Sequence, residues 1–502
     1  MEWHEVVVVG AGISGIGAAI RLAEAGIGDV VLLEAADDIG GTWRANTYPG
    51  CACDVPSRLY AYSFAPNPSW SRTFATQPEV LRYVRGVAEQ HGLRGRIRFG
   101  TRMEDARWDA TEGQWLLTTS RGEMACRFLV AAAGPWNEPN IPAIPGLESF
   151  PGPAFHSARW DHGVDLTGRR VAVVGSGASA VQFVPEIQPD VARLHLYQRT
   201  AQWVLPKPDH AIPALQRWAM GAVPGLRAGS RGLEYGAMEL VGLALRHPRW
   251  VGLLQAVGSA YLRAVVRDPD LRAALTPDYT LGCKRLLFSN TYLQSLTRPN
   301  VEVHASAVTE VAGRTVRAAD GSAAEVDVLL LGTGFRILDM PLADHVRDGA
   351  GRSLADHWGG SPEAYLGTLV PGFPNAFLLL GPSLGTGHTS AFAILEAQLD
   401  LVTAAITEAR EADAVLEVRR PVHDEYVAAV QAALPATVYN AGHCRSYYFD
   451  RNGRNSFSWP WSTRRLVDEV GTFRRDDVDL SPVPAPVPRP VPSRRDGAVS
   501  SS

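Results

Sequence analysis

Two stretches of the chain combine short runs of β-branched residues with a glycine-rich turn and a helical pattern. The first has an apolar run at residues 6–9, a turn at 10–15, a helical stretch to about Ala25 and a second run at 30–34. The second repeats this order, from an apolar run at 171–174 to a run that ends at Arg199. Strand, tight turn, helix and strand form the βαβ unit of a doubly wound sheet. The pattern predicts an α/β fold with two Rossmann-like dinucleotide-binding domains.

A helical pattern interrupts the second of these domains. Between residues 211 and 276, apolar side chains recur four residues apart, as at Leu253, Val257 and Tyr261. We interpret this segment as a helical insertion that covers a substrate pocket. Its apolar character and its arginines leave a role at a membrane surface open, but a packed lid is favoured.

The C-terminal end of the chain has a pattern of its own. From Ser481 onward, prolines alternate with other residues as far as Pro492, and the chain ends in three serines. Such a composition cannot form a packed core, and it predicts an extended, disordered tail over residues 481–502.

Composition narrows the function classes. The chain has 502 residues, more than one hydrophobic core supports, so two or three domains are expected. Hydrophobic residues make up 46% and charged residues 20%, which is typical of a globular protein and excludes wholesale disorder. With 48 basic against 52 acidic side chains, the net charge is −4, which leaves no basic excess for a nucleic-acid partner.

The cysteines and the N-terminal residues bear on the cellular location of the protein. The five cysteines are few, odd in number and scattered, which argues against a disulfide scaffold and for a reducing compartment. The first five residues carry two glutamates, which is unlike a signal peptide. No run of about 18 apolar residues occurs, so we expect no stable membrane insertion. These features predict a cytoplasmic enzyme and leave its oligomeric state open.

The two glycine turns have the form of phosphate-binding loops. The first contains Gly10, Gly12, Ser14 and Gly15, and the second contains Gly175 and Gly177 followed by Ala178, Ser179 and Ala180. The first glycine makes the turn, the second lets the backbone approach a pyrophosphate, and the third lets the helix pack against the strand. A phosphate then lies at the N-terminus of a helix, where free N–H groups favour anions. Ala180 replaces the third glycine in the second copy, which loosens that contact only slightly.

The residue at the end of each second strand distinguishes the two nucleotides. Glu34 lies 24 residues after Gly10, and Arg199 lies 24 residues after Gly175. An acid at this position accepts hydrogen bonds from a free ribose, whereas an arginine suits a 2′-phosphate. The first site therefore fits an adenosine without that phosphate, and the second fits NADP. Two dinucleotides in one chain indicate electron transfer, for which FAD and NADPH are the usual pair.

Two further motifs carry a family resemblance. Phe150, Gly152, His156, Trp160 and Asp161 follow the pattern FxGxxxHxxxW(P/D). Residues 40–54 follow the pattern GGxWxxxxYPGxxxD. With these motifs the chain resembles the type I Baeyer–Villiger monooxygenases, which are flavin-containing enzymes, from Val6 to about Val470. The related N- and S-oxygenating enzymes usually have Phe or Tyr where Trp160 stands, so Trp160 favours the ketone-oxidising branch.

Shorter segments agree with the resemblance. The paired basic residues Lys284 and Arg285, the segment Gly332–Phe335, the pair Gly381-Pro382 and the segment 77–79 each match a family segment, although Gly332 stands where the family has alanine. The resemblance implies that residues 1–150 and 340–480 form an FAD-binding domain. It implies that residues 151–339 form an NADP-binding domain, with the helical insertion at about 211–276.

The resemblance also implies a set of site residues. Cofactor binding is expected from Gly10, Gly12, Ser14, Gly15, Glu34, Gly41, Thr42, Trp43, Asp54, Tyr60, Gly175, Gly177, Ala178, Ser179, Arg199, Thr200, Lys284 and Gly381. Lys284 is expected beside Arg199 at the 2′-phosphate. The catalytic residues are expected to be Arg285 and Asp54, and no metal is expected.

The implied reaction converts a ketone to an ester or lactone with NADPH and O2, through a C4a-peroxyflavin. A peroxide anion needs a fixed positive charge, and a guanidinium stays charged at any working pH. Arg285 is the candidate for this charge, oriented by Asp54. His156 is interpreted as part of a hinge between the domains and not as a base, and the pair Cys51 and Cys53 as structural.

Purely structural roles for these residues, and other functions for the chain, remain open. Asp54 could cap a turn, and Lys284 with Arg285 could be a solvated basic pair. A flavin monooxygenase that oxygenates nitrogen or sulfur would share every nucleotide motif. A disulfide reductase would need a redox-active cysteine pair, which Cys51 and Cys53 do not resemble. A flavoprotein without turnover is disfavoured by the presence of both Arg199 and Arg285.

Overall fold

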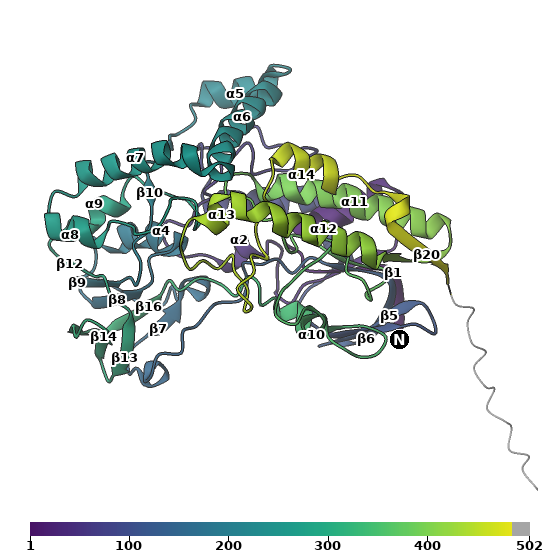
Figure 1. The fold of residues 1–502 in the computed structure, drawn as a ribbon, viewed down its shortest axis with the longest axis horizontal. Coiled ribbons are helices and arrows are strands. Elements are labelled where there is room, and N and C mark those ends of the chain that lie inside the picture. The colour runs from purple at the N-terminus through teal and green to yellow at the C-terminus, as the bar shows by residue number, and fades with distance from the viewer. Residues whose placement is uncertain (484–502) are drawn as a thin grey trace, which may run out of the picture.

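The β-branched runs form the central strands of two separate sheets, which lie side by side in the computed structural model (Figure 1). The structure describes residues 1–483. The predicted α/β fold with two Rossmann-like units is confirmed, because each unit begins with strand, glycine turn, helix and parallel strand.

The first unit is built on a mixed sheet. Its strand order is β17-β4-β5-β6-β1-β2-β3, and β18 pairs with the end of β6. Its strands are β1 Glu2–Val9, β2 Val30–Leu33, β3 Ile97–Arg98, β4 Met103–Asp109, β5 Gln114–Thr119, β6 Gly122–Ala131, β17 Val346–Arg347 and β18 Ala376–Leu378. Val6 and Val8 on β1 pack into the core that contains helices α1 (Ile13–Glu24) and α11 (Ala391–Glu411). Late segments of the chain thus return to the sheet that the first residues begin.

The second unit is built on a parallel sheet with the order β12-β9-β8-β16-β7. Its strands are β7 Ala154–His156, β8 Arg170–Val174, β9 Arg193–Tyr197, β12 Val301–His304 and β16 Val328–Leu331. Helices α4 (Ala178–Ile187) and α9 (Tyr292–Leu296) pack on one face. The other face packs against a small antiparallel sheet of β13 Val308–Ala312, β14 Thr315–Ala318 and β15 Ala323–Glu325.

Shorter elements connect and cover the two sheets. The helices are α2 Thr42–Ala45, α3 Gln77–Gln90, α8 Pro269–Ala274, α10 Leu354–Trp358, α12 Arg420–Ala433, α13 Val438–Ala441 and α14 Thr463–Val470. The strands are β10 Val204–Leu205, β11 Leu287–Phe288, β19 Ala414–Val418 and β20 Val478–Pro482. In Figure 1, α11, α12, α13 and α14 lie together above the first sheet.

The segment 211–276 is helical, as the sequence predicts. It contains α5 (Ala214–Ala222), α6 (Leu226–Arg246) and α7 (Pro248–Val265), and α5 and α6 project from the body of the molecule (Figure 1). Leu253 and Val257 are 72% and 45% exposed, whereas Val251 and Leu262 are buried, so one side of α7 packs on the molecule and the other faces outward. That the insertion covers a substrate pocket stays a prediction. No helix within residues 1–483 is long and apolar enough to cross a membrane.

Two other expectations need correction. Cys283 and Cys444 form a disulfide, with Cα atoms 6.1 Å apart, although the sequence argument expected no disulfide framework. The two residues are 161 positions apart, so only the tertiary fold brings them together. The expected tail begins too early, because Ser481 and Pro482 still pair with β19, whose apolar residues bury the start of β20. The rest of the tail, residues 484–502, lies outside the described part of the chain.

Candidate functional site

The first glycine turn has a shape that fits a dinucleotide. Gly10 has a φ of +112°, and a Cβ there would lie 2.6 Å from the carbonyl oxygen of Ala132. A Cβ on Gly15 would lie 1.9 Å from the carbonyl oxygen of Gly10. Helix α1 starts after Gly12 with no side-chain cap, and Ser14 is buried in its first turn. Its first N–H groups are therefore free for a pyrophosphate.

Glu34 stands beside this turn, as the sequence predicts for a ribose partner. Its two carboxylate oxygens accept hydrogen bonds from the backbone N–H groups of Ala11 and Ala36, each at 2.8 Å. A carboxylate oxygen accepts more than one hydrogen bond, so both oxygens can also bind the hydroxyls of a ribose. The carboxylate is thereby fixed next to the phosphate loop.

The motif around Trp43 lines the same end of the sheet. Gly41 has a φ of +53°, and its backbone touches Gly12 so closely that a Cβ on Gly41 would lie 3.0 Å from the Gly12 Cα. Thr42 and Trp43 begin α2, and the Trp43 indole N–H donates to the Tyr60 hydroxyl at 3.0 Å. Burial raises the pKa of Tyr60, which therefore remains a neutral phenol.

Gly381 closes this end of the first unit from the far part of the chain. It follows β18, and a Cβ on it would lie 2.2 Å from the carbonyl oxygen of Gly367. The sequence-predicted residues around Gly10, Glu34, Trp43 and Gly381 therefore converge on one edge of the first sheet. The glycines let these backbone segments pack directly against one another, which places the free N–H groups of α1 beside Glu34 and fits a bound FAD.

The second glycine turn repeats this geometry. Gly175 has a φ of +101°, and a Cβ on it would lie 2.4 Å from the carbonyl oxygen of Gly332. Helix α4 starts at Ala178 and Ser179 after Gly177, again without a side-chain cap. The second unit therefore offers a second free helix N-terminus to a pyrophosphate.

Two cations lie together next to the second turn. Arg199 is exposed at the end of β9, followed by Thr200, and it lies close enough to Lys284 to influence its charge. Burial, with a smaller contribution from Arg199, lowers the pKa of Lys284. Neither side chain has a carboxylate within ion-pair distance among the described residues, while the Lys284 ammonium lies 4.6 Å from the centre of the Tyr279 ring. Two cations without a counter-ion fit a phosphate dianion.

Arg285 and Asp54 form a two-point ion pair between the two units. The Arg285 Nε and Nη2 atoms each donate to one Asp54 oxygen at 2.7 Å. Burial would raise the pKa of Asp54, but the Arg285 charge and its hydrogen bonds lower it overall. The Asp54 charge in turn raises the pKa of Arg285. The two side chains are 31% and 27% exposed, so the charge is fixed but still accessible.

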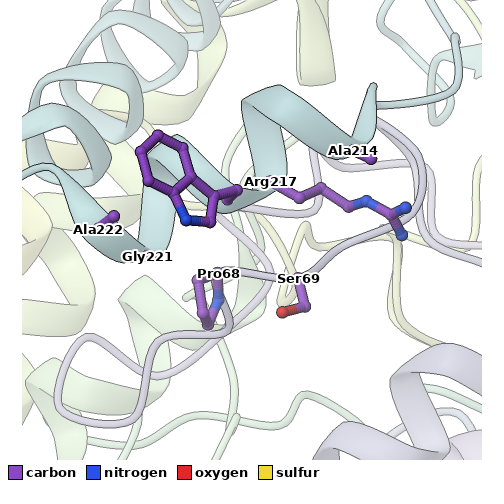
Figure 2. Close-up of a pocket in the computed structure, with 7 residues that line it drawn as sticks. Pro68, Ser69, Ala214, Arg217, Gly221 and Ala222 are labelled. Atoms are coloured by element: carbon purple, nitrogen blue, oxygen red, sulfur yellow. The ribbon is translucent and has the colours of Figure 1, made fainter.

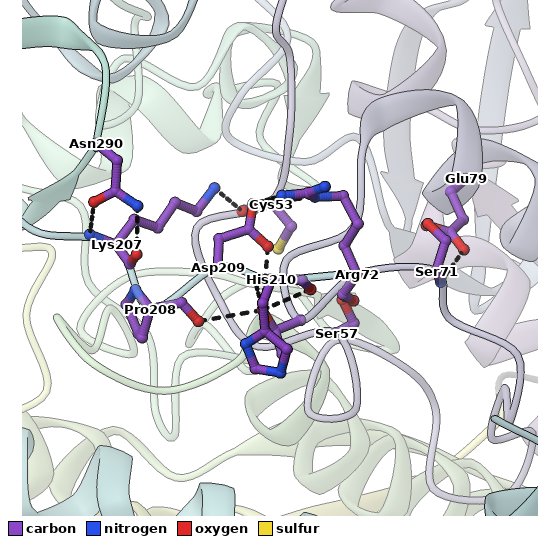
Figure 3. Close-up of polar contacts among 11 residues, drawn as sticks. Cys53, Ser57, Ser71, Arg72, Glu79, Lys207, Pro208, Asp209, His210 and Asn290 are labelled. Carbon is purple, nitrogen blue, oxygen red and sulfur yellow. Dashed lines mark hydrogen bonds and ion pairs between the residues drawn. The ribbon is translucent and has the colours of Figure 1, made fainter. Parts of the chain in front are cut away.

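Lys207 is a charged neighbour that sequence reasoning missed. Its ammonium donates to the Cys53 carbonyl oxygen at 3.4 Å and lies 4.8 Å from the centre of the Phe74 ring. Figure 3 shows it within a network in which Arg72 pairs with Asp209 across the two units. Burial lowers the pKa of Lys207, and its positive charge helps to lower the pKa of Asp54. In the sequence, only its position between Pro206 and Pro208 distinguishes Lys207 from other lysines.

Aromatic side chains lie beside the ion pair. Tyr447 and Tyr448 are near enough to Arg285 to affect its pKa, and Tyr447 is 36% exposed. The Tyr447 ring also contacts Phe457 and Trp136, with ring centres 5.7 and 5.9 Å apart. Tyr448 and Trp459 are buried, so this segment is partly pocket wall and partly core. Trp136 was not expected from the sequence, because it belongs to no motif.

The motif at residues 150–161 lies where the units meet. Gly152 approaches the backbone so closely that a Cβ would lie 2.3 Å from the Asp327 carbonyl oxygen, and Phe150 is buried beside it. The Trp160 ring packs on Phe183, which in turn contacts Tyr48 of the first unit. The Asp161 carboxylate accepts from the Gly163 N–H at 2.9 Å, so it shapes a turn.

His156 is not placed to act as a base. Its Nδ1 accepts a hydrogen bond from the Ala158 N–H at 3.0 Å. Burial lowers the pKa of His156 to about 4, so the ring is neutral near pH 7. This is compatible with the expected hinge role, which stays a prediction.

The remaining cysteines and histidines do not form a redox site. Cys51 and Cys53 are free and buried, and burial raises the pKa of Cys51 to about 12. Among the described residues, His195, Glu302 and His304 bring three ligand-type atoms within 4.8 Å. The two rings share a hydrogen bond of 3.2 Å, and Glu302 pairs with Arg193 at 3.0 Å. We assign no metal to this cluster.

Comparison with known proteins identifies the class. The family described as flavin-binding monooxygenase-like matches residues 3–213. A Baeyer–Villiger monooxygenase of Streptomyces coelicolor is 44% identical over 491 residues, which covers 96% of this chain and 94% of that protein. A solved structure of oxidized steroid monooxygenase bound to NADP has a TM-score of 0.83 and 30% identity, and covers 94% of this chain and 97% of its own. OTEMO in complex with FAD and NADP has a TM-score of 0.84 at 26% identity, over 95% and 99%.

The two phosphate loops, the ribose-binding acid and the paired cations define a flavoprotein that binds two dinucleotides. Together with these similarities, they show that the chain belongs to the Baeyer–Villiger monooxygenases. It is an enzyme that uses FAD, NADPH and O2 to convert a ketone into an ester or lactone. The predictions of the family, the reaction and the two cofactors are confirmed.

Proposed function

We propose that Arg285, held by Asp54, is the fixed positive charge at which this protein carries out Baeyer–Villiger oxidation. The observation that carries the proposal is the two-point ion pair, with both N–O distances at 2.7 Å, at the junction of the two units. Such a pair holds the plane of the guanidinium in one orientation. The contacts to Asp54 use Nε and Nη2, so Nη1 takes no part in the ion pair and the cation can also face a reacting oxygen.

The other residues of the site bind and orient the cofactors. Bound FAD, once reduced by NADPH, supplies the activation of O2. The turn at Gly10 and the carboxylate of Glu34 hold the flavin nucleotide, and the turn at Gly175 holds the nicotinamide nucleotide. Arg199 and Lys284 bind its 2′-phosphate. Asp54 keeps its charge through the working pH range, because Arg285 and Lys207 lower its pKa.

The two units divide the cofactors between them. Residues 1–150 and 340–480 form the FAD-binding domain, since β18 and α11 return to the sheet of β1. Residues 151–339 form the NADP-binding domain, and α5, α6 and α7 are inserted in it. The segment 150–161 is the hinge between them. A cytoplasmic location, and the lack of a nucleic-acid partner, stay predictions from composition.

The substrate is an apolar ketone. Trp136, Tyr447 and Phe457 form an aromatic wall beside the cation, and a hydrophobic ketone can pack on their rings while its carbonyl group faces Arg285.

The test is a product assay on the purified yellow protein with NADPH, O2 and a ketone panel. The panel contains cyclohexanone, 2-octanone, phenylacetone, acetophenone and a steroid ketone, with thioanisole as a sulfur substrate. Wild-type protein is expected to form esters or lactones. Arg285→Ala is expected to lose at least about 100-fold in ester formation, because a donor to the reacting oxygen is removed.

Arg298→Ala is the matched control, because this arginine is exposed and far from the motif residues in sequence. Anaerobic reduction of the flavin by NADPH is expected to remain within about threefold of wild type in Arg285→Ala, since hydride transfer needs no such charge. Normal ester yield from Arg285→Ala would remove this residue from the mechanism. Sulfoxide as the sole product of the wild type would favour oxygenation of heteroatoms instead.

A further inference from the structure

The helices α5, α6 and α7 expose an extensive apolar surface. Among the described residues, ten of the fifteen large hydrophobic side chains that are exposed belong to residues 215–257. They are Leu215, Trp218, Val223, Leu226, Leu233, Leu240, Leu243, Trp250, Leu253 and Val257. We call these ten side chains the apolar face. Large exposed hydrophobic side chains concentrated in one segment mark a surface that binds something more often than scattered ones do.

The apolar face follows the geometry of the helices. Leu226, Leu233 and Leu240 are seven residues apart on α6, so they lie along one line of that helix. Trp250, Leu253 and Val257 form a similar line on α7, and Trp250 is 64% exposed. Side chains that recur at helical spacing on the solvent side do not belong to the core of this unit.

The same helices carry an excess of positive charge, and their acidic side chains face the protein. Residues 214–265 contain six arginines and two glutamates, an excess of four positive charges in a chain whose net charge is −4. Both glutamates are turned inward: Glu234 pairs with Arg58, and Glu239 pairs with His388. Of the six arginines, only Arg246 has a carboxylate within ion-pair distance in the part of the chain that the structure describes. Arg231 donates to the backbone carbonyls of Arg58 and Ala61. The other four arginines are Arg217, Arg227, Arg249 and Arg263.

Trp218 and Arg217 place an exposed aromatic ring and an arginine without a carboxylate partner among the described residues side by side at the edge of the apolar face. Both belong to α5, and Figure 2 shows Arg217 on this helix near Pro68 and Ser69 of the first unit. They line an open pocket of about 580 Å³ with Gly221 and Ala222. An aromatic ring beside an unpaired guanidinium at the rim of an apolar surface is typical of proteins that settle at a lipid–water interface.

We propose that the apolar face binds the surface of an anionic lipid bilayer. The leucines and tryptophans enter the region between headgroups and acyl chains, and the unpaired arginines contact lipid phosphates. A second copy of the chain fits less well, because two faces that each carry the excess of positive charge would repel each other. The apolar face lies on the surface of the membrane and does not span it, since no described helix is long and apolar enough.

Flotation of the full-length, FAD-loaded protein with lipid vesicles tests the proposal. One set of vesicles is phosphatidylcholine alone, and the other contains one quarter phosphatidylglycerol. Wild-type protein is expected to float with the second set and to be released as salt rises from 0.1 to 1 M. The double variant Leu233→Gln/Leu240→Gln is expected to reduce the bound fraction at least about tenfold, because two leucines no longer enter the apolar layer.

The matched control is Trp3→Gln/Ile141→Gln, which changes two exposed apolar side chains outside the face, each 53% exposed. It is expected to bind like the wild type. Flavin content and circular dichroism show whether each variant is folded. Wild-type protein that floats with neither set of vesicles would overturn the proposal, as would equal binding by Leu233→Gln/Leu240→Gln. A wild-type dimer that this double variant converts to a monomer, without vesicle binding, would assign the face to self-association instead.

Discussion

At the scale of single residues, Ala180 shows how one exception to a motif is compensated elsewhere. It stands where the first turn has Gly15, and the sequence suggests a slightly looser contact between helix and strand. In the structure, a Cβ added to Gly332 would lie only 3.3 Å from the Ala180 Cβ. Gly332 is also the position where the family has alanine. Gly332 therefore leaves free the space that the methyl group of Ala180 requires.

This pairing predicts a coupled effect of two substitutions. Gly332→Ala is expected to destabilise the protein by about 1 kcal/mol, because the added methyl group crowds Ala180. Adding Ala180→Gly is expected to recover most of that loss, since it empties the opposing position. Thermal midpoints of the two single variants and the double variant measure the coupling. Additive losses in the double variant would show that the two positions do not interact.

The cations at the second turn predict the choice of coenzyme. Arg199→Ala and Lys284→Ala are each expected to raise the KM for NADPH by about 10- to 100-fold and to leave the KM for NADH nearly unchanged, because only the 2′-phosphate contact is lost. Steady-state kinetics with both coenzymes measure this. Arg193→Ala is the control, since Arg193 begins the strand β9 that precedes Arg199 and pairs with Glu302. An unchanged preference would mean that the 2′-phosphate binds elsewhere.

Residues within a motif could be predicted from the sequence, and residues outside one could not. Glu34, Arg199, Asp54 and Arg285 could be proposed as site residues because each has a fixed spacing from a turn or lies in a matching segment. Lys207 and Trp136 approach the same site from segments without such spacing, and their side chains meet it only through the packing of the two units. Spacing along the chain predicts contacts between neighbouring elements of one βαβ unit. It does not predict contacts between loops that are far apart in the sequence.

At the scale of elements, the disulfide ties two loops of the active site together. Cys283 directly precedes Lys284 and Arg285, and Cys444 precedes the segment with Tyr447. A Cβ on Gly442 would lie 2.4 Å from the Cys283 Cβ, so the two loops already approach closely. The cross-link therefore fixes the loop that carries Arg285 against the segment that carries Tyr447.

Reduction of this cross-link is expected to lower the thermal midpoint of the wild type by a few degrees, because a bridge between residues 161 apart restricts the unfolded chain. Dithiothreitol is expected to have no such effect on Cys444→Ser. Thiol titration of the denatured protein without reductant is expected to give three thiols of the five cysteines. Five thiols in protein purified without reductant would show that the bridge does not form.

Element prediction succeeded where the apolar pattern was strong and failed where it was ambiguous. The first βαβ unit is observed as β1, α1 and β2, within a few residues of the predicted limits. Residues 211–276 were correctly predicted to be helical, but the pattern did not indicate that Leu253 and Val257 would be exposed. A helical period shows that apolar side chains share one face. It does not show whether that face meets protein or something else.

At the scale of the whole molecule, the reaction depends on how the two domains meet. The Tyr48 hydroxyl donates to the Gln182 side-chain oxygen at 3.0 Å, and the Gln182 amide donates to the Ala52 carbonyl oxygen at 3.0 Å. Gly50 lies between them with a φ of +74°. A Cβ on Gly50 would lie 2.7 Å from the Gln182 carbonyl oxygen of α4. This turn therefore sets the distance between the first unit and α4, the helix that we propose holds the second pyrophosphate.

Gly50→Ala is expected to slow the reduction of FAD by NADPH at least about tenfold, because the added methyl group pushes α4 away and hydride transfer depends steeply on distance. FAD content is expected to stay at the wild-type level, since the first glycine turn is untouched. Anaerobic stopped-flow absorbance measures the rate. Gly26→Ala is the control, because Gly26 also has a positive φ, +78°, but a Cβ there would meet nothing within 4 Å. If both variants lost the same factor, backbone strain would explain the effect, and the contact between the domains would not set the rate.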